Sequence, residues 1–92
     1  MTKHNLVFTH GYTRRAATFI RNRPAMLKPY QKTLELLELN PFHPSLRLHK
    51  PKGSIEEIRS VSINLAHRIT IEFLIEGKTI IPVNAGPRDE VY

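Results

Sequence analysis

The side chains best able to do chemistry in this chain are arginines, histidines and tyrosines, because there is no cysteine. Arg68 lies in a run of alternating residues, and Arg88 and Tyr92 lie in a polar tail after the last apolar stretch. A guanidinium stays protonated and matches phosphate oxygens in shape, so an arginine can bind a phosphate but cannot act as a base. A tyrosine ring can stack on a nucleobase. From the residues alone, however, an ion pair with Glu72 is the simpler interpretation of Arg68.

The tail has equally simple structural interpretations. Arg88 is followed by Asp89 and Glu90, which could hold it in a solvated local ion pair of little energetic weight. The ring of Tyr92 could pack on the sheet instead of contacting a ligand. The place of Arg88 after Gly86 and a proline favours a functional role.

Histidine is the side chain that most readily exchanges a proton near neutral pH. His49 lies in a loop, where a lone histidine more often has a structural role. His43 lies between two prolines, which favours a turn, and His67 shares the apolar face of its run, which favours a core position. No cluster of His, Asp and Glu has metal-ligand spacing, and there is no glycine-rich phosphate loop.

Positive charge is concentrated in the first half of the chain. The formal net charge is +6, with +8 in residues 1–52 and −2 in residues 53–92. A basic half this pronounced favours a polyanionic partner, with nucleic acid first among the candidates. A soluble basic domain with no nucleic-acid role is the alternative.

The first half predicts one strand and two helices. Residues 5–9 are apolar in part and precede a His-Gly break, which indicates a strand. Thr13 is the expected N-cap of a helix that runs to about Arg21. A second helix should run to Leu39, with a buried seam of Leu27, Tyr30, Leu34 and Leu37. Pro29 predicts either a distinct first turn near residue 25 or a start only near residue 28.

The second half predicts three strands, over residues 58–64, 67–75 and 79–85. Glu76 and Gly77 form a two-residue hairpin signal, and Pro82 should lie at an edge or a bulge because it cannot donate to a ladder. The element order β-α-α-β-β-β predicts an α+β fold in which both helices cover one face of a small antiparallel sheet. Arg68, Thr70, Ser60 and Ser62 are then expected on the open face.

Two leucines of the second helix fall outside its seam. Leu39 could pack under Phe42 in the following loop, whereas Leu36 is difficult to bury within one small domain. A second apolar stripe of this kind predicts that Leu36 and Leu39 contact a partner chain.

Length and composition predict one domain over residues 1–92, with no cofactor. The chain contains no apolar run long enough for a membrane span, and its first residues do not resemble a signal peptide. We therefore expect a cytoplasmic protein.

Several stretches together resemble a known family. They are residues 34–46, which include Asn-Pro-Phe-His-Pro-Ser-Leu, then residues 49–53, residues 67–69, and the closing Gly-Pro-Arg-Asp-Glu-Val-Tyr of residues 86–92. This set is similar to the RelE/ParE superfamily of toxins from type II toxin–antitoxin systems, in particular its RelE/StbE or YafQ-like branch. The resemblance spans nearly the whole chain and is strongest from Leu34 onward.

The resemblance implies a ribosome-dependent messenger RNA endoribonuclease that works without a metal. In such enzymes the ribose 2′-hydroxyl attacks the adjacent phosphate, leaving a cyclic or 3′ phosphate and a 5′-hydroxyl. The reaction needs alignment, charge neutralisation and proton transfer. The resemblance also implies a cognate antitoxin, with operator DNA bound only by the toxin–antitoxin complex.

The resemblance assigns catalytic roles to Arg68, Arg88, Tyr92 and His49. Arg68 matches an arginine that meets the scissile phosphate, and Arg88 matches a second catalytic arginine. Tyr92 matches a terminal aromatic residue that stacks on the substrate or donates to it. His49 matches a histidine of the YafQ-like motif. We further expect RNA contacts from Arg47, Lys50, Lys52, Arg59 and Ser62.

Two alternatives remain at this point. Ser62 and Ala66 occupy positions where YafQ-like proteins carry a histidine and an aspartate, which leaves a catalytically weakened toxin that only binds its antitoxin. The same fold also serves ParE-like inhibitors of DNA gyrase, and fold alone does not choose between these activities.

Overall fold

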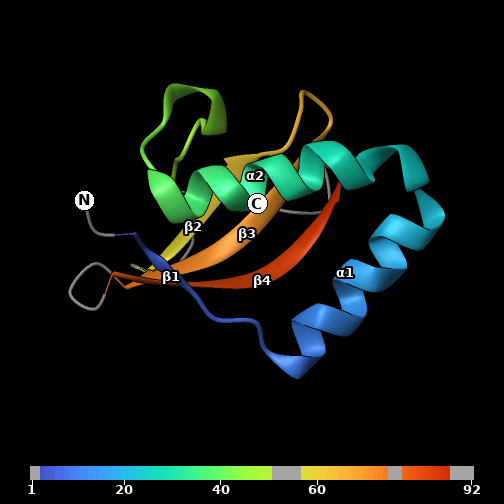
Figure 1. Cartoon of the computed structure of the whole chain (residues 1–92), viewed down its shortest axis with the longest axis horizontal. Helices are drawn as coiled ribbons and strands as arrows, with labels where there is room; N and C mark the ends of the chain where they lie inside the picture. Colours follow the sequence, from blue (N-terminus) through green and yellow to red (C-terminus); the bar gives the residue numbers. More distant parts are fainter. Residues whose placement is uncertain (1–2, 51–56, 75–77, 88–92) are drawn as a thin grey trace.

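A four-stranded sheet with two helices packed against it forms the fold (Figure 1). The computed structural model describes residues 3–50, 57–74 and 78–87. In chain order the elements are β1 (Asn5–Leu6), α1 (His10–Asn22), the 3-10 turn η1 (Pro24–Met26), α2 (Leu27–Leu39), the 3-10 turn η2 (Pro44–Leu46), β2 (Ile58–Ser62), β3 (His67–Leu74) and β4 (Thr79–Pro87). The predicted α+β fold and its element order are confirmed.

The strand order in the sheet is β1-β4-β3-β2. β3 pairs antiparallel with both β2 and β4, as predicted, whereas β1 runs parallel to β4. The sheet is therefore mixed. β1 is also shorter than the predicted strand, because its last bond to β4 is from the backbone N–H of Val7 to the carbonyl of Ile80, and Phe8 is exposed.

β4 contains the irregularity that its proline predicts. Thr70 pairs with Asn84 and Ile71 pairs with Pro82, so Val83 is an extra residue on β4. A bulge removes the need for a ladder donor at this point, and proline has none to give. The bulge also turns the carbonyl of Val83 toward α1, where Arg15 donates two hydrogen bonds to it, at 3.3 and 2.9 Å.

α1 begins earlier than predicted. Its N-cap is Thr9, whose side-chain oxygen accepts a hydrogen bond from the backbone N–H of Tyr12. The prediction of Thr13 as the cap, with a break at His10 and Gly11, is wrong. Thr9 has the extended backbone that a cap needs, and a glycine in the first turn costs a helix little where the cap supplies the missing partner.

α2 shows how a helix accommodates its own proline. The 3-10 turn η1 comes first, as the prediction of a distinct first turn required, and Pro29 is the third residue of α2. The first N–H groups of a helix have no partner within it, so proline costs nothing there. Of the predicted seam, Tyr30 and Leu37 are buried and Leu34 is partly so. Leu27 is 43% exposed, so its predicted place in the seam is wrong.

The core lies between the helices and one face of the sheet. Figure 1 shows α2 lying across the sheet and α1 alongside β4. Ile69, Ile71 and Ile80 from the strands meet Leu37 from α2 and Tyr12 from α1 in one buried cluster. None of the helices in the described ranges has the length and apolar character needed to cross a bilayer.

The two leucines predicted to contact a partner differ in their surroundings. Leu36 is partly buried and packs against the core cluster, so its apolar surface is largely covered within the chain. Leu39 is 54% exposed, and Phe42 beside it is 62% exposed, so Leu39 is not covered by Phe42. The argument for a partner surface therefore moves from Leu36 to Leu39 and Phe42.

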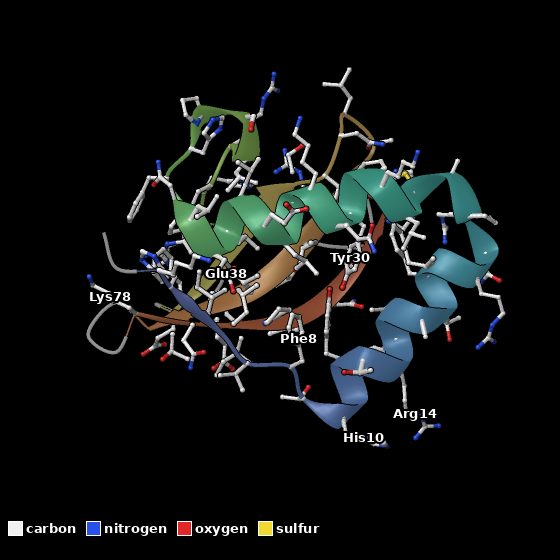
Figure 2. All side chains as sticks on the ribbon, viewed as in Figure 1. Phe8, His10, Arg14, Tyr30, Glu38 and Lys78 are labelled. Carbon is white, nitrogen blue, oxygen red and sulfur yellow. The ribbon has the colours of Figure 1, made fainter. Side chains whose placement is uncertain are left out.

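A buried hydroxyl pair joins the two helices. The hydroxyls of Tyr12 and Tyr30 lie 2.6 Å apart, and Figure 2 shows Tyr30 beneath α2, facing α1. Burial, then the hydrogen bond to Tyr30, raise the pKa of Tyr12 far above its ordinary value, and burial also raises the pKa of Tyr30. Both phenols are therefore neutral at physiological pH.

We predict that Tyr12→Phe lowers the free energy of unfolding by about 1–3 kcal/mol, because the buried Tyr30 hydroxyl loses its partner. The Tyr12→Phe/Tyr30→Phe double variant should lose less than the two single variants added together, because neither residue then leaves an unpaired polar group. Urea unfolding of the four proteins at neutral pH measures this difference, and additive losses would contradict the pair.

Unfolding at high pH tests the same pair of tyrosine hydroxyls in a second way. Above about pH 10 the unfolded chain loses the protons of Tyr12 and Tyr30, while the folded chain keeps them, so wild-type stability should fall as pH rises beyond that value. The double variant should lose the part of this fall that the pair contributes.

Candidate active site

Arg68 lies on the face of the sheet that the helices leave open. In β3 the side chains of Ile69 and Ile71 are buried in the core, so the alternation of a strand sends Arg68 and Thr70 to the opposite face. The register places Arg68 between Ser62 on β2 and Gly86 on β4. The prediction that Arg68 and Thr70 share the open face is confirmed.

His49 reaches this face from the edge of the sheet. Its backbone exchanges two hydrogen bonds with Ser60, at 3.1 and 2.8 Å. His49 therefore forms a one-residue bridge on the outer side of β2, the strand at that edge of the sheet. From there Nδ1 of the ring lies 3.3 Å from Nη1 of Arg68. Two residues that are nineteen positions apart, both predicted to be catalytic, are therefore in direct contact.

This contact constrains the tautomer of the imidazole. A guanidinium only donates, so Nδ1 must offer its lone pair and the ring proton must lie on Nε2. The carbonyl oxygen of Arg47 also lies 3.4 Å from Nδ1, a contact that needs the opposite tautomer. Nδ1 cannot accept from Arg68 and donate to the carbonyl of Arg47 at the same time. The charged donor at the shorter distance is the stronger partner, and between the two tautomers it favours the one with the proton on Nε2.

The turn between β2 and β3 holds Arg68 in place. The side-chain oxygen of Asn64 accepts from the backbone N–H groups of Ala66 and His67, at 2.9 and 2.8 Å. An asparagine that bonds its own backbone in this way fixes a tight turn. The spacing of residue types in the sequence did not predict that Asn64 positions Arg68. An asparagine followed by two small or apolar residues is nevertheless a turn signal.

Two other histidines have structural roles, as predicted. The ring of His67 contacts Phe19 edge-on at 5.6 Å on the core side of the sheet. Burial, and then the charge of Arg23, lower the pKa of His67, so this ring is neutral near pH 7. His43 begins the turn η2, where its Nδ1 accepts from the backbone N–H of Ser45.

Ser60 lies beneath this site without a hydrogen-bond partner. Its side chain is fully buried, and its hydroxyl is one of two buried side-chain polar groups in the described residues that have no partner. The cross-strand neighbour of Ser60 is Thr70, and its edge neighbour is His49. A buried hydroxyl without a partner is unfavourable.

The predicted RNA-binding residues separate into distinct places. Arg47 and Lys50 are exposed and flank His49 in sequence, on the edge segment beside β2. Arg59 pairs with the buried Ile71 and so lies on the helix side of the sheet, away from Arg68, and its RNA contact stays a prediction. Ser62 pairs with Arg68 and shares its face of the sheet, but it is buried and its hydroxyl donates to the carbonyl of Asn64.

Lys52, Arg88 and Tyr92 lie outside the described residues. The nearest described neighbour of the last two is Pro87, which pairs with His67 at the end of β4. Among the described residues, no three His, Cys, Asp or Glu side chains converge as a metal site would need.

Comparison with known proteins gives a clear result for the fold. No model of a protein family matches the sequence, and no curated protein matches it. A chain of the Escherichia coli DinJ-YafQ toxin–antitoxin complex has a TM-score of 0.77 at 12% identity, over 97% of both chains. The YoeB/ParE toxin from Agrobacterium tumefaciens has a TM-score of 0.71 at 16% identity, over 91% of this chain and 98% of that one. A chain of the RelBE2 toxin–antitoxin complex of Mycobacterium tuberculosis has a TM-score of 0.67 at 14% identity, over 95% and 100%.

These likenesses show one shared architecture. The chain has the RelE/ParE-like toxin fold, as the sequence resemblance predicted. The identities are too low to show more than the fold.

We predict that neutral His49 is in the Nε2–H tautomer and that Arg68→Met shifts it toward Nδ1–H, which can then donate to the carbonyl of Arg47. Long-range proton–nitrogen NMR correlations distinguish the two forms directly. His43, whose Nδ1 accepts from a backbone N–H, is an internal reference that should not change. A wild-type His49 that already carries its proton on Nδ1 would contradict the contact with Arg68.

Proposed function

We propose that this chain is an endoribonuclease toxin that cleaves messenger RNA on the ribosome and is neutralised by a cognate antitoxin. The observation that carries the proposal is the contact of Arg68 with His49 on the open face of the sheet, 3.3 Å apart. It joins a permanent cation, suited to a phosphate oxygen, to a proton-transfer group. The basic charge of the chain also favours a polyanionic substrate.

The proposed reaction needs no group beyond the chain and the RNA. The 2′-hydroxyl loses its proton to a base, and its oxygen attacks the adjacent phosphorus. The bond from phosphorus to the 5′-oxygen then breaks, and the 5′-oxygen takes up a proton. The products are a 2′,3′-cyclic phosphate and a 5′-hydroxyl, and the charge on the phosphoryl oxygens must be stabilised throughout.

The described residues have suitable roles in this reaction. Arg68 binds a non-bridging phosphate oxygen. As its guanidinium turns to the phosphate, Nδ1 of His49 is released and its lone pair can accept the proton of the 2′-hydroxyl. Arg88 and Tyr92 follow directly from the strand end beside Arg68, and the family resemblance assigns them charge stabilisation and base stacking.

The antitoxin part of the proposal rests on the fold and on one exposed surface. Chains of this fold occur in the DinJ-YafQ and RelBE2 toxin–antitoxin complexes. Leu39 at the end of α2 and Phe42 in the next loop together expose apolar surface of the kind that a partner helix or strand covers. We propose this pair as part of the antitoxin contact.

We predict that Arg68→Ala lowers the rate of messenger RNA cleavage in a translation-coupled assay by about 100- to 1,000-fold, because one charged donor to the transition state is lost. The same change should restore growth of cells that overproduce the chain. Arg21→Ala removes the same charge from an exposed position at the end of α1 and is the matched control. If Arg68→Ala remains as toxic as Arg21→Ala, the site assignment is wrong.

The terminal tyrosine supplies an independent prediction. Tyr92→Ala should slow cleavage by about 5- to 150-fold, because base stacking contributes about 1–3 kcal/mol. Tyr92→Phe should retain most of the rate if stacking is its role. Thermal melting should show little change in either variant, and a loss of folding stability that accounts for the lost activity would instead indicate a residue that packs on the sheet.

A further inference from the structure

A basic groove lies between α1 and the end of β4, apart from the contact of Arg68 with His49. Its volume is about 550 Å³, and its walls are α1 with the residue that follows it on one side and residues 84–87 on the other. Three arginines line it: Arg14, Arg15 and Arg23. None of the described residues that line it is acidic. The groove therefore concentrates positive charge that no neighbouring carboxylate offsets within the described lining.

Two of these arginines are held in fixed positions. Arg15 donates from Nε and Nη2 to the carbonyl oxygen of Val83, the bulged residue of β4, at 3.3 and 2.9 Å. Its guanidinium lies over Gly11, where an added Cβ would be 3.4 Å from Nη1. The guanidinium of Arg23 lies 5.2 Å from the ring centre of Phe19. Their charges are therefore pre-organised, and little side-chain entropy remains to be lost on binding.

Arg14 is exposed, as is Arg15, and Figure 2 shows Arg14 projecting from the first half of α1. Arg14 and Arg23 are nine residues apart, which corresponds to about 13 Å along a helix axis. That distance exceeds the span of one phosphate group and fits several consecutive phosphates of a nucleic-acid strand. A single small anion would leave most of the groove empty.

One residue of the groove wall is a backbone neighbour of the candidate active site. Gly86 lines the groove, and it is also the cross-strand neighbour of Arg68. An RNA strand whose scissile phosphate lies at Arg68 would have to cross the end of β4 to enter the groove along α1.

We propose that the groove between α1 and β4 binds the sugar-phosphate backbone of the RNA on one side of the cleavage point. The inference rests on the proposed function and extends it by naming a second RNA contact outside the reacting groups. Binding there is independent of base sequence, because guanidinium groups facing a backbone read charge and not base edges. It supplies affinity and fixes the direction of the strand.

The test is RNA binding by the full chain, with a matched pair of charge changes on one helix. The probe is a fluorescein-labelled 12-nucleotide single-stranded RNA, with 2′-O-methyl at every ribose so that it cannot be cleaved. Arg14→Gln removes a groove charge, and Arg21→Gln removes an exposed charge of α1 that does not line the groove. Fluorescence anisotropy across a range of salt concentrations gives the Kd and its salt dependence for each protein.

Each phosphate contact on a single strand contributes about 0.7 to the slope of log affinity against log salt. Arg14→Gln should therefore reduce the slope by about 0.7 and weaken binding about fivefold near 0.1 M salt. Arg14→Lys should keep the slope, because the charge remains, and Arg21→Gln should match the wild type. Equal effects of Arg14→Gln and Arg21→Gln, or no effect of either, would overturn the inference.

The inference and the proposed function fail separately in this design. If wild type cleaves messenger RNA but Arg14→Gln binds the probe as wild type does, only the groove assignment is lost. If wild type cleaves no RNA while Arg14→Gln alone weakens binding, the groove stands as an RNA site and the proposed nuclease activity is lost.

Discussion

The antiparallel register of β3 between β2 and β4 is the constraint on which the rest of the structure depends. It buries Ile69 and Ile71 under the helices, and for the same reason it places Arg68 on the opposite face, between Ser62 and Gly86. A slip of one residue would exchange the faces and put a guanidinium in the core, where an unpaired charge is very costly. The burial that stabilises the sheet therefore also fixes the candidate site.

Other features bring polar groups to that fixed position. The bridge at Ser60 brings His49 to the sheet edge, within 3.3 Å of Arg68, and the Asn64 turn fixes where β3 starts. The bulge at Val83 gives Arg15 a carbonyl to bind and so forms one wall of the basic groove. The candidate site and the groove meet at Gly86. The two proposed RNA contacts, at Arg68 and in the groove, would therefore both lie near the end of β4.

Much of the fold could be predicted because its signals are local. The alternation through β3 and the missing donor of Pro82 gave the strands and the bulge, and Pro29 gave the separate first turn of the second helix.

The parallel pairing of β1 could not be predicted, because it depends on where the chain arrives after both helices. Thr9 and Thr13 are both good caps, and only tertiary packing, through Tyr12, favours Thr9. Arg59 has the same parity as the buried Val61, so the alternation of a strand alone places it on the helix side of the sheet. The contact of His49 with Arg68 joins distant residues, so spacing alone could not predict it; the family resemblance had already paired their roles.

The most direct test of the central claim, that Arg68 and its neighbours cleave RNA, is to map RNA 5′ ends in cells shortly after the chain is induced. The account predicts new 5′-hydroxyl ends within translated codons that are absent when Arg68→Gln is induced to the same level. Intact messenger RNA together with arrested DNA replication would contradict it and favour a gyrase inhibitor of the same fold. Intact messenger RNA with normal growth would indicate a chain that has kept the fold without the activity.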